Sequence, residues 1–176
     1  MDTNGLLDFR EQKDEFYRTH PHSPLTPAQR QHFTGLSYYD PNPDLLLEVE
    51  VDVFEEQEQI LMQTNRDELK PFFRYGSFDV PVGEQTATLT IYRSQEGHYF
   101  LPFVDASASI ETYPAGRYLD LEPLDDDLFI VDFNLAYNPY CAYNERWVCP
   151  VTPAENRIKL PIKAGEKLPP DEWVAK

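Results

Sequence analysis

The segment 132–156 gathers polar and reactive side chains in a stretch that has neither helical nor strand periodicity. It holds four Asn, three Tyr, three Pro and both Cys residues of the chain. An irregular connection of this length is usually functional or disordered, and its aromatic content argues against disorder. Asn side chains also satisfy the backbone in turns, so two interpretations stay open: a loop held in shape by Asn, or a loop that lines a ligand or catalytic site. The candidate site residues here are Asp132, Asn134, Asn138, Cys141, Tyr143, Asn144 and Asn156.

A second group of polar residues precedes a predicted strand upstream of this loop. Its candidate site residues are Asp105, Thr112, Tyr113 and Arg117. Arg117 either pairs with a buried carboxylate, such as Asp105 or Asp132, or clamps an anionic ligand through two hydrogen bonds. Asp132 interrupts an apolar run, where an unpaired charge is costly, so we expect it to have a partner.

Cys141 and Cys149 are separated by seven residues, a spacing that fits neither a C-x-x-C redox motif nor a zinc pair. Two reduced buried thiols, a loop-closing disulfide and a catalytic thiolate are the alternatives, and the last lacks a His nearby in the sequence. His20 and His22 share one side of an extended segment, but two ligands do not make a metal site. The acidic run 125–127 lacks the pattern of a calcium loop. We therefore expect no metal site, and the sequence leaves open which cofactor, if any, the protein uses.

The same segments carry a resemblance to a known family. They are similar to the signature of an uncharacterised prokaryotic family, catalogued as domain of unknown function 1684 (DUF1684). The matching segments are Asp132-Phe133-Asn134, Asn138 to Tyr143, Cys149-Pro150, Pro153 to Arg157, Ala164-Gly165-Glu166, Phe100 to Phe103, Asp105, Glu111 to Tyr118, Phe9-Arg10, Lys13-Asp14 and Ser23-Pro24-Leu25. After Asp105 the family tends to have a Thr-Ser-Gly-like turn, whereas this chain has 106–109 as Ala-Ser-Ala-Ser, which would alter a loop that needs positive φ. The resemblance implies no activity.

The elements that must position these residues begin with helices. The segment 6–18 is predicted to be a charged helix, which the prolines after His20 must end. A second short helix is predicted to begin at Thr26, because Pro27 suits the first helical position and Gln29 completes a capping box.

From residue 45 the pattern changes to that of strands. Apolar residues occupy every odd position of 45–53, which predicts a strand with one buried face. The segments 78–82 and 86–92 repeat this alternation, and Gly83-Glu84 between them predicts a tight hairpin. Further strands are predicted at 58–63, 98–104, 117–121, 128–133 and 157–162.

About eight strands with helices only at the front predict a mainly β fold, an antiparallel barrel or sandwich with short N-terminal helices packed on it. Alternating βαβ units are absent, which disfavours a doubly wound nucleotide fold. We expect a single domain, 1–176. It comprises a helical segment 1–40, a β domain 45–166 that contains the irregular loop 132–156, and a tail 167–176 with Trp173 as a candidate anchor.

The composition limits the classes of partner. Of 176 residues, 41% are hydrophobic and 14% aromatic, enough for a core, and the formal charge is −16. That charge argues against nucleic acid and anionic membranes, because phosphate contacts need clustered Lys and Arg. The negative charge is typical of a soluble protein, and the alternative is a protein that binds a cationic partner. The chain shows no signal peptide and no apolar run long enough to span a bilayer, so we expect a cytoplasmic protein.

Three functional hypotheses follow. The first is a small-molecule binding module whose polar or anionic ligand lies in a pocket lined by 105–117 and 132–156. The second is a hydrolase or lyase that uses the Asp, Arg and Tyr groups of the same segments. The third is a structural protein or homodimer that pairs open sheet edges. Nucleophile-elbow, Walker A, dinucleotide and zinc-protease motifs are absent, which lowers the common enzyme classes and leaves open whether the chain is an enzyme.

Overall fold

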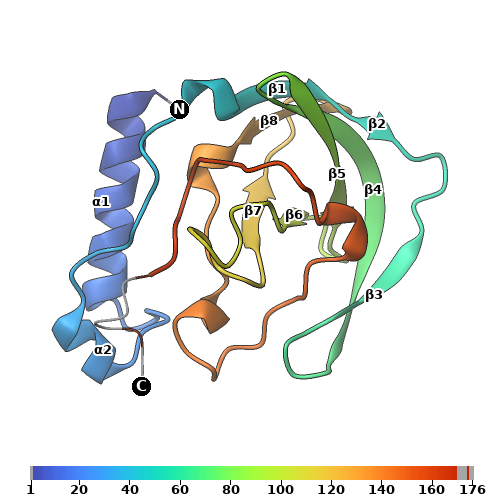
Figure 1. Ribbon diagram of the computed structural model, residues 1–176. Helices are drawn as coiled ribbons and strands as arrows, with labels where there is room; N and C mark the ends of the chain where they lie inside the picture. The colour runs from blue at the N-terminus through green and yellow to red at the C-terminus, as the bar shows by residue number, and fades with distance from the viewer. Residues whose placement is uncertain (1, 170–173, 175–176) are drawn as a thin grey trace.

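The computed structural model describes residues 2–169 and 174 (Figure 1). The chain has a mainly β fold preceded by two helices, α1 (Thr3–Thr19) and α2 (Pro27–His32), which confirms the predicted fold class. In the described part of the chain, neither helix has the length and apolarity needed to cross a membrane. Trp173, the predicted anchor of the tail, lies outside the described residues.

Helix α1 is longer than predicted, because Asp2 caps its N-terminus by accepting a hydrogen bond from the Gly5 amide at 2.8 Å. The side chains that face the protein recur at helical spacing and are Leu6, Arg10, Lys13 and Tyr17. Helix α2 begins as predicted, with the complete capping box between Thr26 and Gln29.

The strands form two sheets. Their bounds are β1 (Leu46–Glu50), β2 (Asp52–Val53), β3 (Gln59–Gln63), β4 (Leu69–Val82), β5 (Gln85–Arg93), β6 (Tyr99–Phe103), β7 (Arg117–Leu121) and β8 (Leu128–Asp132). The larger sheet has the order β2-β4-β5-β6-β7, with β3 also paired to β4, and β1 pairs with β8 in a separate ribbon. Every pairing between these strands is antiparallel. The arrangement stays open, so it is barrel-like or sandwich-like without closing.

The predicted hairpin joins β4 and β5. Val82 pairs with Gln85, and Gly83 between them adopts φ +62, a conformation that suits glycine in a two-residue turn. The register of the two strands shifts between Arg74 and Gly76, so a bulge bends β4 there.

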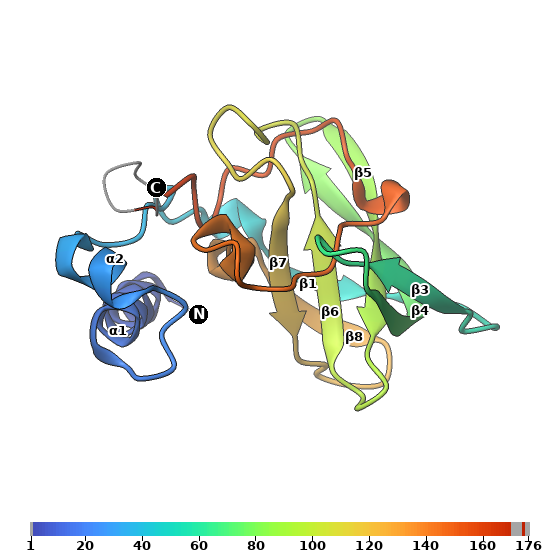
Figure 2. The same ribbon diagram turned by 90° about the horizontal axis from the view of Figure 1, so that it is seen from below.

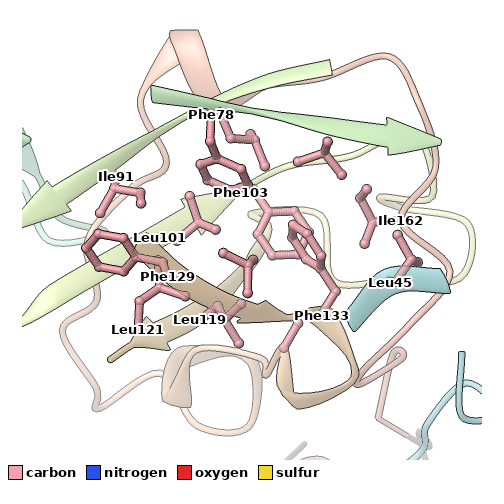
Figure 3. Packing of buried hydrophobic residues seen from close by; sticks show 14 of the residues in the cluster. Leu45, Phe78, Ile91, Leu101, Phe103, Leu119, Leu121, Phe129, Phe133 and Ile162 are labelled. Carbon is pink, nitrogen blue, oxygen red and sulfur yellow. The ribbon is translucent and has the colours of Figure 1, made fainter. Parts of the chain in front are cut away.

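The core lies between the two layers (Figure 3). Labelled side chains from β4 to β8 point toward one another, with Phe103 against Phe133 at 5.4 Å between ring centroids. Leu119 and Leu121 of β7 belong to this core, so Tyr118 and Asp120 face the opposite side of the sheet. This alternation supplies the side chains of the site described below.

The segment 157–162, predicted to be a strand, is extended but makes only one isolated bridge, between Val104 and Arg157. The Ile162 amide donates to the Asp105 carboxylate rather than to a carbonyl, so a side chain replaces a ladder partner. The predicted strand 45–53 is likewise split into β1 and β2, because Val51 lies outside both strands and donates to the Asp127 carbonyl.

The irregular loop contains three short 3-10 turns, η2 (Phe133–Leu135), η3 (Tyr140–Ala142) and η4 (Ala154–Asn156), and a further one, η1 (Pro43–Leu45), precedes β1. Seen from below, the helices stand to one side of the sheet, and the orange chain of this loop lies between them and the strands (Figure 2). The loop therefore forms a layer between the helices and the sheet.

Candidate functional site

A cleft of about 670 Å³ lies between α1, the outer face of the sheet and the irregular loop. This volume falls within the range of roughly 300–1,000 Å³ that is typical of small-molecule sites. Its rim includes the β5–β6 turn, which contributes Ser94, Glu96 and His98.

The sheet side of the cleft is a continuous row of aromatic rings. Phe72 of β4 stacks on Phe100 of β6 with 5.5 Å between centroids. Phe100 meets Tyr118 of β7 edge to face at 4.8 Å, and Tyr118 meets Tyr137 at 5.9 Å. These separations are those of favourable aromatic pairs. Four rings from three strands and the loop therefore form one wall.

Helix α1 supplies the opposite wall through Phe9, Lys13 and Tyr17. Phe9 is 38% exposed, so part of its ring is open to the cleft. The Lys13 ammonium lies 5.0 Å from the Tyr137 ring centroid, which places a cation at the end of the ring row.

The irregular loop closes the third side. Tyr140 and Trp147 pack at 5.1 Å, and the Trp147 indole donates to the Pro24 carbonyl at 2.9 Å. The Tyr118 hydroxyl donates to the Pro150 carbonyl, which fixes the loop against β7. The loop is thus attached both to the sheet and to the segment after α1.

Two phenols of the cleft keep their protons. Tyr137 donates to the Asp120 carboxylate at 2.8 Å, and burial together with Asp120 raises the pKa of this phenol. Burial likewise raises the pKa of Tyr118. Both phenols therefore stay neutral near pH 7 and act as hydrogen-bond donors. Within the described residues, no cluster of three or more His, Cys, Asp or Glu side chains is arranged to hold a metal ion.

Arg117 lies in a buried cluster behind this cleft. Its guanidinium donates to three carbonyl oxygens, those of Ile162 at 2.7 Å, of Glu166 at 3.1 Å and of Ala164, and it pairs with Asp105 at 3.4 Å. Burial lowers the pKa of Arg117, and the nearby Asp105 opposes that shift. The side chain holds the segment 162–166 against the core.

Asp105 is the centre of a second set of contacts within that cluster. It accepts hydrogen bonds from the Ser107 hydroxyl at 2.9 Å and from the Ile162 amide at 2.5 Å, and Thr112 completes the group. The turn that follows it places Ser109 at φ +68, so serine occupies a left-handed conformation there. The departure from the family turn thus falls on a loop that does contain a positive φ.

Asn138 and Tyr143 converge on Glu166. The Asn138 backbone N–H and the Tyr143 hydroxyl donate to Glu166 Oε2 at 2.8 and 2.7 Å, and Lys13 Nζ lies 2.6 Å from Oε1. The side chain of Glu166 is 1% exposed, so this is a buried ion pair with added hydrogen bonds. It joins α1, the irregular loop and the C-terminal segment.

The remaining Asn candidates satisfy the backbone. Asn134 accepts from the Asn42 backbone amide and donates to the Asp132 carboxylate, and both hydrogen bonds are at least partly buried. Asn156 makes three hydrogen bonds of 2.8 Å to Thr90 and Pro102, across β5 and β6. Asn144 caps an exposed turn by accepting from Arg146 at 3.1 Å.

Cys141 lies near the cleft but behind its surface. The Tyr113 hydroxyl lies 4.0 Å from Cys141 Sγ, and burial raises the pKa of Tyr113. Both cysteines are free thiols, and Cys149 is the one that borders the cleft.

None of the eleven site residues predicted from the sequence is among the described residues that line the cleft. Tyr137, Pro139 and Tyr140 do line it, and they are sequence neighbours of Asn138 or Cys141. Sequence reasoning missed the rings on the sheet. A signal for them exists: Phe100 and Tyr118 occupy the faces of β6 and β7 where a strand with one wet face would carry polar residues.

Fold and site together define a mainly β protein with a helix-covered aromatic cleft. The model of the family described as "Protein of unknown function (DUF1684)" matches residues 31–167, and the chain belongs to this family. The solution NMR structure of an uncharacterised protein from Haloarcula marismortui is 34% identical, with a TM-score of 0.71 over 93% of this chain and 92% of that one. No curated protein matches the sequence.

Proposed function

We propose that this protein is a binding module that holds a small molecule with a flat ring system in the cleft. The observation that carries the proposal is the uninterrupted row from Phe72 to Tyr137, which faces a cavity instead of a packed side chain. Rings in such a row offer both apolar area and stacking faces. A ligand with aromatic or heteroaromatic character matches them best.

Polar groups stand at the Tyr137 end of the row. Lys13, which also pairs with Glu166, lies 5.0 Å from the Tyr137 ring centroid, and the Asp120 carboxylate accepts from the Tyr137 hydroxyl, so the polar edge of the ligand points toward this end. The irregular loop lines the cleft as the first hypothesis proposed. The segment 105–117 acts behind it by supporting β7 through Asp105 and Arg117.

The geometry favours binding over the hydrolase or lyase hypothesis. Asp105 and Arg117 are engaged in one buried cluster, and Asp132 is bonded to Asn134 elsewhere. An acid–base mechanism needs such groups within reach of one substrate. The homodimer hypothesis stays a prediction, which light scattering of the purified protein tests.

A thermal-shift screen of heteroaromatic and matched aliphatic metabolites tests the proposal. A ligand present at about 100 times its Kd stabilises the native state by about 2.7 kcal/mol, which raises the Tm by roughly 5–11 °C at this chain length. Affinity is then measured by quenching of Trp147 fluorescence in a Trp173→Phe background, since the chain has two Trp residues.

Two variants locate the binding site. Phe72→Ala removes the outermost ring of the row and is expected to weaken binding about tenfold. Ile110→Ala removes a side chain that is 76% exposed and outside the cleft, and should leave affinity unchanged. The proposal fails when no ring compound raises the Tm, or when both variants bind a hit with equal affinity.

A further inference from the structure

Two thiols meet in the wall of the cleft. Cys141 in η3 and Cys149 after Trp147 hydrogen-bond to each other through their side chains. The Tyr113 hydroxyl lies beside Cys141, and Cys149 borders the cavity. A small solute that enters the cleft therefore reaches Cys149 first, with Cys141 behind it.

The backbone around both sulfurs is held from outside the pair. The Cys149 amide donates to Asn65 Oδ1 at 2.8 Å, and the Asn65 amide donates back to the Cys149 carbonyl at 3.0 Å. The Asn65 side chain also donates to the Trp147 carbonyl. On the other side, the Ala142 amide donates to the Pro139 carbonyl and fixes the turn that carries Cys141. These contacts hold the backbone at both cysteines in place.

We propose that Cys141 and Cys149 are a site of reversible oxidation, at which a small hydroperoxide converts the two thiols into a disulfide. A bulky disulfide reagent is excluded by the burial of Cys149, which is 7% exposed. The site does not depend on the ligand proposed for the cleft.

The environment assigns different roles to the two sulfurs. The hydrogen bond from Cys141 lowers the pKa of Cys149 to about 7, and Lys70 adds to this effect while burial opposes it. The same hydrogen bond, together with burial, raises the pKa of Cys141. Because the thiolate is the nucleophile, Cys149 reacts first and Cys141 second.

The reaction balances with hydrogen peroxide as the oxidant. The Cys149 thiolate attacks one peroxide oxygen, the O–O bond breaks, and the leaving hydroxide takes up a proton to become water. Cys149 is now a sulfenic acid. Cys141 loses its proton, its sulfur attacks Cys149 Sγ, and the expelled hydroxide takes that proton. Two thiols are oxidised by two electrons in total, and one peroxide is reduced to two waters.

Peptide mapping of the wild-type protein tests the site directly. The protein is treated with hydrogen peroxide, its remaining thiols are blocked with N-ethylmaleimide, and it is digested with trypsin without reduction. Trypsin cuts after Arg146, between the two cysteines, so a disulfide joins peptides 118–146 and 147–157. We expect this linked pair, and its disappearance after dithiothreitol. Recovery of both peptides as separate alkylated or oxygenated species overturns the proposal.

Serine variants separate the two roles. Cys141→Ser should stop at the sulfenic acid, which dimedone traps on Cys149, whereas Cys149→Ser should react at least roughly tenfold more slowly. Equal rates in the two variants contradict the assignment. Thermal denaturation first establishes that each variant is folded, and the wild-type map decides the proposal when one is not.

The rate in the wild type should rise with pH through about 7 and then level off, because the thiolate fraction of Cys149 rises. The titratable groups that face Cys149 are Cys141, Tyr113, Tyr118 and Lys70. The hydrogen bond with Cys149 raises the pKa of Cys141, and burial raises the pKa of Tyr113 and of Tyr118, so the midpoint near pH 7 reports Cys149. A rate that is constant from pH 5 to pH 9 overturns the assigned nucleophile.

Discussion

Replacing Arg117 by Met tests whether this residue stabilises the fold or binds an anionic ligand. The guanidinium is 1% exposed and is shared among the carbonyls of the segment 162–166 and the Asp105 carboxylate. Met fills a similar volume but donates no hydrogen bond, so the carboxylate and the carbonyls lose their partner. Removing one member of a buried ion pair costs about 3–5 kcal/mol, because the other charge stays buried without compensation.

Denaturant and thermal unfolding measure this loss. At this chain length a change of 1 kcal/mol shifts the Tm by about 2–4 °C, so the Arg117→Met variant should melt roughly 6–20 °C lower. Arg18→Met is the matched control. Arg18 pairs with Glu15 at 2.8 Å on the exposed side of α1, and such pairs contribute about 0–1 kcal/mol.

Two results would refute this reasoning. The first is an Arg117→Met variant whose loss of stability lies within 1 kcal/mol of that of Arg18→Met. The second concerns the double variant that also carries Asp105→Leu: replacing both members of a buried pair by apolar groups is often close to neutral, so it should recover part of the loss. A double variant that loses the sum of the single effects contradicts the pairing of Arg117 with Asp105.

Three further perturbations follow from the same contacts. Lys13→Met leaves Glu166 without its cation and should destabilise the protein by about 3 kcal/mol and speed amide exchange in α1, whereas exchange as slow as in the wild type would refute the pairing. Asn156→Ala breaks three buried hydrogen bonds and should cost about 3 kcal/mol by denaturant unfolding, whereas Asn144→Ala removes one exposed hydrogen bond of a half-buried residue and should cost less than about 0.5 kcal/mol. Ser109→Gly relieves a positive φ and should add about 0.5–1 kcal/mol; a lower Tm would show that the turn is unstrained.

The sequence predicted the parts of the fold that depend on local chemistry. The capping box at Thr26 fixes the start of α2, and the alternation in 78–92 fixes the β4–β5 hairpin. The first part of β4 escaped prediction because Pro71 and the bulge before Gly76 interrupt its alternation. The segment 157–162 has the residues of a strand and makes backbone hydrogen bonds with Val104 and Ala106, but at Ile162 the side chain of Asp105 replaces a strand partner, which no pattern along the chain reveals.

The site was harder to predict than the fold for a physical reason. Polar residues such as Asn156 and Arg117 are conspicuous in the sequence, yet their hydrogen-bonding capacity is used within the protein. The cleft is instead lined by aromatic rings from α1, β4, β6 and β7, which lie far apart along the chain. Single rings such as Phe72 resemble core residues, and only the sheet register places them in one row.

The polar residues still matter to the cleft, because they hold the segment that connects its two walls. Arg117 binds the carbonyls of Ile162 and Glu166, which ties this segment to β7. The side chain of Glu166 then binds Lys13 of α1 and Tyr143 of the irregular loop. The segment 162–166 therefore accepts hydrogen bonds from the sheet and forms an ion pair with the helix. We expect a change at Arg117 to loosen α1 as well as the core, because the two are connected through Glu166, so amide exchange in α1 should rise in Arg117→Met. Unchanged exchange there would mean that α1 is held by its apolar face alone.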